Sequence, residues 1–545
     1  MDPTFKPPDD GNEVESDGSG SNGEDSHEEI EVEGAASASV PQQAPVPLSH
    51  DWCSKSGDKW SSNPVAPSIT PNPIPMPGVT RHAQSRIQEV EDAFLYFLSE
   101  EILNKIAGYT NLEGCRRYQN WHPTDTVEIK ALVGVQLLAG VFRSRGESSQ
   151  SLWSGPNNRA IFSAVMSLKR FQQLLGALRF DDREDRVSRL RGALAGDPDK
   201  FAPIREIWEM WVPRLAFGFN PGERVCVDEQ LVAIRGRCSF RQYMPSKPAK
   251  YGLKMWVLCD VETSYALYIQ PYLGKASPSA RPEKEQGKRV VLDLVAGLPR
   301  GHTVTTDNFF TRALGKELLS HGILLLGTLR QHKPEIPMEL KKIRPQNSSL
   351  FGFNDMATVV SYIPKKGKNI FLLSTKHRDG ATALTPPYKP AIITDYNKSK
   401  GAVDTLDQLV GTYTSRRKSN RWPMAVWGNI LDISAYNALV LWLGIDPRWG
   451  QGKLHRRRLF LEQLGTALVR EQIARRSRVP RAPNSSALVL STQEAASRPS
   501  KARCYMCPVK KRLRCSNQCN ICKSTTCMEH SVRVCCTCID NLPQI

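Results

Sequence analysis

The sequence lacks a hydrophobic run of the length that crosses a membrane, because no stretch reaches ~18 continuous apolar residues. Its first residues, MDPTFKPPDD, lack both the basic region and the apolar region of a secretory signal. No repeat of fixed period is visible. The chain has 545 residues, of which 40% are hydrophobic. We therefore expect several globular domains, neither secreted nor membrane-spanning.

Acidic residues are concentrated at one end of the chain. Residues 1–40 contain 12 Asp and Glu against one Lys, yet the whole chain carries a net charge of +18. The rest of the chain is therefore strongly basic, which points to a nucleic-acid partner. A basic protein without such a partner would have the same composition.

Few cysteines lie outside the C-terminal region, since nine of the 14 lie between Cys504 and Cys538. Clustered pairs in a chain without a secretory signal indicate metal ligands rather than disulfides. Eight ligands suffice for two tetrahedral structural Zn²⁺ sites. We expect alternate pairs to share an ion, so that one site holds Cys504, Cys507, Cys527 and His530 and the other holds Cys519, Cys522, Cys535 and Cys538.

Sequential pairing of these ligands remains an alternative, Cys536 could replace Cys535, and Cys515 is left over. The same ligand order also describes RING domains, which would make the protein a ubiquitin ligase. Against that reading, only residues 523–526 separate the second and third ligand pairs, and the segment 503–545 has no Trp to dock a partner enzyme.

The apolar periodicity changes along the chain. It is helical from about 85 to 220, where Ile87, Val90, Phe94, Phe97, Leu98 and Ile102 share one face. From Arg224 to about 330 the order is β-β-β-α-β-α-β, which is typical of a ribonuclease H-like α/β fold. Residues 333–390 interrupt that order with short strands, and further helices follow.

These changes predict eight segments: a disordered acidic tail (1–80); a helical domain in two parts (81–222 and 413–478), to which the family resemblance given below assigns dimerisation and DNA binding; a ribonuclease H-like core in two parts (223–332 and 391–412), to which that resemblance assigns catalysis; a β-rich insertion (333–390); a linker (479–502); and a small zinc-binding cysteine-rich domain (503–541).

Three carboxylates stand where that fold would bring them together. Asp228 lies within the first strand, Asp307 ends the fourth strand, and Asp404 opens a later helix with Asp407 three residues on. Converging carboxylates repel one another unless a hard cation neutralises them, and Mg²⁺ takes such oxygen ligands. Two such ions could support phosphoryl transfer. The alternative is that each Asp is a turn or cap residue, and Asp404 fits that alternative best.

At these residues the chain resembles piggyBac-type transposases and proteins derived from piggyBac elements. The matching stretches are VDEQLVAIRGRCSFRQYMPSKPAKYGLKMWVLCD, TTDNFF and YNKSKGAVDTLDQLVGTYTSRRKSNRWPM. The resemblance implies that Asp228, Asp307 and Asp404 are a catalytic triad, that Asp407 is a fourth acid beside it, and that Mg²⁺ or Mn²⁺ is the cofactor. It also implies excision through hairpin ends, integration at TTAA targets, a homodimer and a nuclear location.

Basic residues beside an aromatic one suggest DNA contacts in the segment 415–424. Arg416, Arg417, Lys418 and Arg421 could bind phosphates, and Trp422 could stack on an unpaired base. The alternative for Trp422 is a core residue that opens a helix. In the cysteine-rich domain, Lys510, Lys511 and Arg512 could serve the DNA binding that the resemblance implies there.

The sequence therefore predicts a DNA transposase that acts by Mg²⁺-dependent phosphoryl transfer on double-stranded DNA. The alternative is a domesticated relative, a nuclear DNA-binding or chromatin protein that has lost transposition.

Overall fold

The computed structural model describes residues 51–65, 73–154, 159–192, 199–275, 283–307, 312–497, 502–508, 514–515, 517 and 524–531. The acidic residues 1–40 lie outside these ranges, so their predicted disorder stays a prediction.

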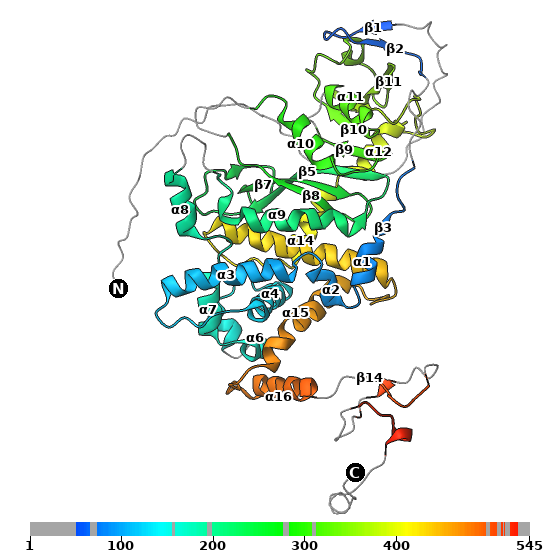
Figure 1. Cartoon of the computed structure of the whole chain (residues 1–545). Coiled ribbons are helices and arrows are strands. Elements are labelled where there is room, and N and C mark those ends of the chain that lie inside the picture. The colour runs from blue at the N-terminus through cyan, green and yellow to red at the C-terminus, as the bar shows by residue number, and fades with distance from the viewer. Residues whose placement is uncertain are drawn as a thin grey trace, which may run out of the picture. The chain divides into compact units, whose positions relative to one another are not determined.

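Five strands form the centre of a mixed sheet (Figure 1). The strand β5 (Arg224–Ala233) pairs with β7 (Tyr251–Asp260) on one side and with β9 (Thr303–Thr306) on the other. The outer neighbours are β8 (Ala266–Pro271), which pairs with β7, and β10 (Leu324–Leu329), which pairs with β9. Pairings among β5, β9 and β10 are parallel, and the other two are antiparallel. The first and fourth of these strands are therefore neighbours, as a ribonuclease H-like order requires.

The residues predicted as an insertion continue this sheet. They form β11 (Ser349–Phe353), β12 (Thr358–Lys365) and β13 (Lys368–Ser374), and β13 pairs antiparallel with β10. The short β6 (Gln242–Tyr243) closes the opposite edge beside β7. The complete sheet has 11 strands, because β1 (Asp51–Cys53) and β2 (Lys59–Ser61) extend it beyond β11.

The strands β1 and β2 differ from the prediction of disorder over residues 1–80. Trp52 and Trp60 face each other across this hairpin, and Trp60 is buried in the core. Two indole side chains supply enough apolar area to hold a short hairpin on a sheet edge. A second exception is β3 (Gly78–Val79), which pairs with β4 (Phe219–Asn220).

The helical region begins with three helices. They are α1 (Arg81–Arg86), α2 (Val90–Leu95) and α3 (Glu100–Arg117). The predicted run from Ile87 to Ile102 is divided between α2, which starts with a capping box of Glu89 and Asp92, and α3, whose N-cap is Ser99. The predicted apolar face is nevertheless buried at all six positions. The following helices are α4 (Thr126–Val141), α5 (Ser149–Trp153), α6 (Ala160–Val165), α7 (Leu168–Ala177), α8 (Arg183–Gly192) and α9 (Ala202–Phe217).

One long helix, α14 (Trp422–Ile445), joins the sheet to the helical region. It packs against β5 and α9 on one side and against α2, α4 and α15 (Arg456–Ala474) on the other (Figure 1). By length and composition it could cross a membrane, but 83% of its apolar window is buried inside the protein. It is therefore a core helix.

The remaining helices cover the sheet or extend the helical region. They are α10 (Gln286–Val295), α11 (Arg312–Ser320), α12 (Ala391–Ser399), α13 (Ala402–Thr412) and α16 (Pro483–Ser497). The helix α16 lies where the sequence predicted a linker. It packs against α6 and α15 with Val489 buried, so the apolar residues in that Ser- and Pro-rich stretch belong to a helix.

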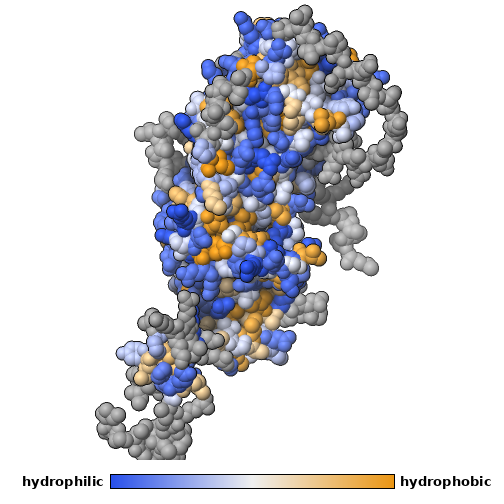
Figure 2. Space-filling model, turned by 90° about the vertical axis from the view of Figure 1, so that its right-hand side faces the viewer, coloured by the Kyte–Doolittle hydropathy of each residue, from blue (hydrophilic) through white to orange (hydrophobic). Residues whose placement is uncertain are grey.

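The surface is mainly polar. On the face seen in Figure 2, hydrophilic residues are spread widely and hydrophobic ones gather in smaller patches around its middle. Dispersed apolar side chains are usual on a folded protein. In the cysteine-rich domain, the described elements are β14 (Ala502–Arg503) and β15 (Arg514–Cys515), which pair with each other, and a 3₁₀ turn at Met528–His530.

Candidate active site

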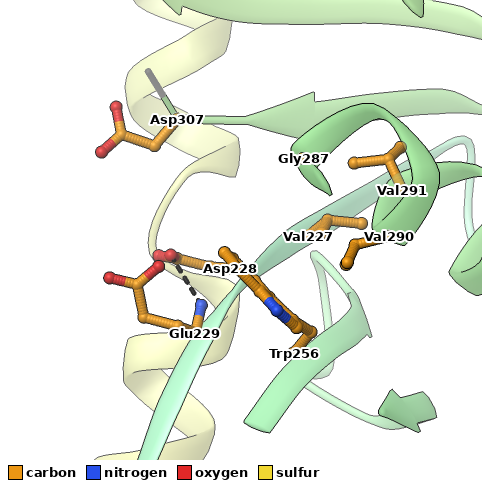
Figure 3. A pocket seen from close by; sticks show the side chains of 8 residues that line it. All are labelled: Val227, Asp228, Glu229, Trp256, Gly287, Val290, Val291 and Asp307. Atoms are coloured by element: carbon orange, nitrogen blue, oxygen red, sulfur yellow. Dashed lines mark hydrogen bonds between the residues drawn. The ribbon is translucent and has the colours of Figure 1, made fainter. Parts of the chain in front are cut away.

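Asp228 lies in the middle of β5, and Asp307 directly follows the neighbouring strand β9. The register pairs Val227 of β5 with Thr306, the last residue of β9. Asp228 is the next residue of β5, and Asp307 follows β9 directly. Both side chains line one small pocket, and Figure 3 shows their carboxylates directed to the same side. Parallel pairing of the two strands therefore brings together two acids that are far apart in sequence.

Hydrogen bonds orient these two carboxylates. Asp228 Oδ1 accepts the backbone N–H of Glu229 at 2.7 Å. Asp307 Oδ1 accepts the hydroxyl of Thr328 on β10 at 2.8 Å and lies 3.5 Å from the hydroxyl of Tyr396 on α12. Asp307 is exposed, whereas Asp228 is half-buried.

The helix α13, which carries two more acids, packs against β5 and β7. Asp404 Oδ1 accepts from Lys247 Nζ at 2.9 Å, and Asp407 Oδ1 accepts from Gln230 Nε2 at 3.1 Å. The N-cap of α13 is Gly401, so Asp404 lies inside the first helical turn. The alternative that Asp404 is the N-cap residue is therefore wrong.

Burial dominates the electrostatics of Asp228 and Asp407. Burial raises the pKa of Asp228 to about 8, and the negative charges of Glu229 and Asp404 add to the effect while Lys247 opposes it. Burial also raises the pKa of Asp407. A divalent cation would reverse these shifts, since it favours the charged form of each carboxylate. The donor set consists of hard oxygen atoms, which fits Mg²⁺ or Mn²⁺.

Four residues at this site were not among the predicted site residues: Lys247, Gln230, Thr328 and Tyr396. Tyr396 opens the matching stretch YNKSKGAVDTLDQ, so its position carried a signal. Gln230 and Lys247 also lie within a matching stretch, whereas Thr328 resembles any strand residue. What these residues share is a contact across the fold, which no local pattern encodes.

The arginines of the segment 415–424 are bound within the protein. Arg417 donates to the carbonyls of Ser144 and Glu147. Arg421 donates to the carbonyls of Leu175, Gly176 and Leu178, at the C-terminal end of α7. Arg416 lies 3.9 Å from the buried Asp432. The structure thus gives these three side chains internal partners, while Lys418 is exposed.

Trp422 packs within an aromatic cluster. Its ring stacks on Phe201 with centroids 5.6 Å apart and meets Phe240 edge-on at 5.0 Å. It also forms the first residue of α14. These contacts match the alternative of a core Trp that opens a helix, although its side chain is only partly buried.

A second candidate metal centre lies in the cysteine-rich domain. The ligand atoms of Cys504, Cys507, Cys527 and His530 all lie within 4.8 Å of one another. The sulfurs of Cys507 and Cys527 are 3.7 Å apart, close to the ~3.8 Å edge of a tetrahedron with Zn–S bonds of ~2.3 Å. This set is the first of the two predicted by alternate pairing. The other predicted ligands and the basic cluster lie outside the described residues: Cys519, Cys522, Cys535, Cys538, Lys510, Lys511 and Arg512.

Comparison with known proteins gives a consistent picture. A family model described as Transposase IS4 matches residues 91–439, more than half of the chain. The chain is 26% identical over 350 residues to the human PiggyBac transposable element-derived protein 3, a match that covers 60% of this chain and 56% of that protein. It is 22% identical over 374 residues to the human PiggyBac transposable element-derived protein 2, covering 63% and 60%. The match thus spans less than two-thirds of either relative.

A solved structure resembles the whole described body. It is a cryo-EM structure of a piggyBac transposase synaptic complex with hairpin DNA, with a TM-score of 0.70 and 30% identity. The match covers 85% of this chain and 100% of that chain. The likeness therefore extends over the sheet and the helices together.

Proposed function

The chain belongs to the family of piggyBac-type transposases and piggyBac-derived proteins, and from that premise we propose that it is a cut-and-paste DNA transposase. The observation that supports the proposal is that Asp228 and Asp307 line one pocket, while α13, which carries Asp404 and Asp407, packs against β5. A transposase needs such a cluster to cleave one DNA strand and to join the freed 3′-end to another. The proposed catalytic triad is Asp228, Asp307 and Asp404.

The residues of the site have separable tasks. Mg²⁺ or Mn²⁺, when bound by the four carboxylates, would lower the pKa of the attacking water or hydroxyl and stabilise the leaving 3′-oxygen. Thr328 and Tyr396 hold the Asp307 carboxylate in a fixed orientation. Lys247 donates a hydrogen bond to Asp404 and so holds that carboxylate in place. Its ammonium group also places a positive charge where a DNA phosphate would approach.

The proposed substrate is double-stranded DNA, excised through hairpin ends and integrated at TTAA. The similar solved structure, a piggyBac transposase synaptic complex with hairpin DNA, supports this proposal. The net charge of +18 supports it too, because phosphate contacts dominate DNA affinity. Among the predicted contacts, Lys418 retains an exposed side chain for this role.

The remaining expectations also stand as proposals. Cys504, Cys507, Cys527 and His530 would hold one structural Zn²⁺, and the second predicted set would hold another. We place the protein in the nucleus as a homodimer, since joining two transposon ends requires two active sites.

A domesticated DNA-binding protein is the second candidate, because the curated relatives are named as element-derived proteins. The two candidates differ in whether the acid cluster is used. A protein that only binds DNA gains nothing from carboxylates that repel phosphates.

An excision assay separates the two. The repeats that flank the gene are placed around a reporter, and excision with restored TTAA is scored for the wild type, for Asp307→Asn and for the control Asp293→Asn. Asp293 is an exposed acid on α10 that pairs with Arg289 and is not among the residues that line the pocket of Asp228 and Asp307. We expect excision by the wild type and the control only. Excision by none of them, with the protein bound to DNA in the nucleus, would favour the domesticated protein.

A further inference from the structure

Two buried amide side chains connect the core helix α14 to the acid cluster. Gln230 lies on β5, two residues after Asp228, and Asn429 lies on α14. Asn429 Nδ2 donates to Gln230 Oε1 at 2.9 Å, and Gln230 Nε2 donates to Asp407 at 3.1 Å. Both amides are 1% exposed. One chain of hydrogen bonds thus joins β5 to α13 and α14, which lie much later in the sequence.

We propose that Gln230 and Asn429 form a relay that positions the Asp407 carboxylate for metal binding. The proposal rests on the proposed function, because it assumes that Asp407 is a metal ligand. It adds two positioning residues that neither the sequence pattern nor the family comparison assigned. Neither residue touches the metal or the DNA in this role.

The polarity of the relay follows from its partners. An amide offers a carbonyl oxygen on one side and an NH₂ group on the other. Asn429 donates to Gln230, so the Gln230 oxygen must face α14 and its NH₂ group must face Asp407. A donor is therefore presented to the carboxylate, whereas the opposite orientation would set two oxygens against each other. Asn429 controls the orientation of Gln230 without contacting the acid.

A positioning role explains why these residues are polar. A buried amide is expensive unless its hydrogen bonds are satisfied, and apolar residues of the same shape would pack as well. Within the described part of the chain, Gln230 is the donor whose hydrogen bond reaches the Asp407 carboxylate. Such outer partners fix the rotamer of a metal ligand, and their loss typically lowers metal affinity 10–100-fold.

The test compares substitutions of the two relay residues with a matched control on α14. Gln230→Met and Asn429→Leu remove the relay with little change in volume. Asn437→Leu is the control, because Asn437 is also a fully buried amide on α14, but it bonds the backbone of Ala266. The full-length proteins are titrated with Mn²⁺ by isothermal calorimetry, and thermal midpoints are recorded by circular dichroism.

We expect both Asn→Leu variants to have lower thermal midpoints. Only Gln230→Met and Asn429→Leu should weaken Mn²⁺ binding, by ~10–100-fold. The double variant should bind Mn²⁺ as tightly as Gln230→Met alone, because the two residues act through one hydrogen bond to Asp407. Should Asn429→Leu not fold, Gln230→Met alone gives the comparison with the control.

The inference is overturned if the wild type binds Mn²⁺ and the relay variants bind it within twofold of the control. It is also overturned if the two losses multiply in the double variant, since independent effects are not a relay. Failure of the wild type to bind Mn²⁺, with Asp307→Asn behaving identically, would instead overturn the proposed function and the inference with it.

Discussion

Replacement of Arg421 by Ala should destabilise the protein without lowering its affinity for DNA. The guanidinium of Arg421 donates to Leu175 O at 3.2 Å and also to Leu178 O, at the end of α7. The last carbonyls of a helix have no partner within the helix, and a cation there also interacts favourably with the helix dipole. Burial lowers the pKa of Arg421 to about 10, and the neighbouring Arg179 adds to this effect. The group remains charged at neutral pH.

The magnitude follows from these contacts. Removing a charged hydrogen-bond partner from buried carbonyls costs about 1.5–3 kcal/mol. We therefore expect Arg421→Ala to lower the free energy of unfolding in urea by ~2–3 kcal/mol. The matched control is Lys418→Ala, three residues earlier, because Lys418 is exposed. That change should alter stability by no more than ~0.5 kcal/mol.

DNA binding provides the second measurement. Each phosphate contact contributes ~0.9 to the slope of log K against log salt concentration on duplex DNA. Lys418→Ala should reduce that slope by ~0.9 if the segment contacts the backbone, and Arg421→Ala should leave it unchanged. The reasoning would be refuted if Arg421→Ala kept the wild-type free energy of unfolding and lost ~0.9 from the slope.

Three further predictions concern other parts of the chain. Gly236→Ala should destabilise the protein by ~1–3 kcal/mol in urea unfolding, because a Cβ there would overlap the carbonyl of Asn420, whereas Gly108→Ala, with nothing within 4 Å, should not. Cys527→Ser should remove one zinc ion per chain by mass spectrometry of the metal content, and an unchanged content would contradict the assigned ligand set. Arg116 lowers the pKa of Asp182 to about 2, below its unfolded value of ~3.9, so this pair contributes stability that is lost as pH falls from ~4 to ~2. In Arg116→Gln the urea midpoint of unfolding should fall less between pH ~4 and ~2 than in the wild type. The same pH dependence in both proteins would refute the assignment.

The central sheet was predictable because each of its strands carries a local signal. The segment RVCVDEQLVAI alternates and is rich in β-branched residues, and β5 spans most of it. The hairpin of β1 and β2 was missed because its stability comes from the buried Trp60, which contacts a core that the local sequence does not describe. The same holds for α16, whose Ser- and Pro-rich composition hides one buried apolar face.

The acid cluster was predictable for a different reason. Parallel neighbours in a sheet bring their corresponding ends together, so strand order alone places Asp228 beside Asp307. The basic segment 415–424 was harder, because a positive charge says nothing about its partner. Arg417 and Arg421 donate to backbone carbonyls more than 200 positions away in the sequence. Sequence patterns therefore place backbone elements better than they assign partners to long, flexible side chains.

Several features of the acid cluster are unfavourable for a folded protein unless a metal ion binds there. Burial disfavours the charged form of Asp228 and Asp407, and the buried amides of Gln230 and Asn429 stabilise the core less than apolar residues would. An acid cluster in a basic protein also repels the phosphates that the rest of the surface attracts. For a protein that only binds DNA, each of these features is a disadvantage without a return. A divalent cation removes all of them together, because it favours the charged carboxylates, gives the relay a ligand to hold and attracts phosphate. These features therefore support the proposed phosphoryl-transfer chemistry.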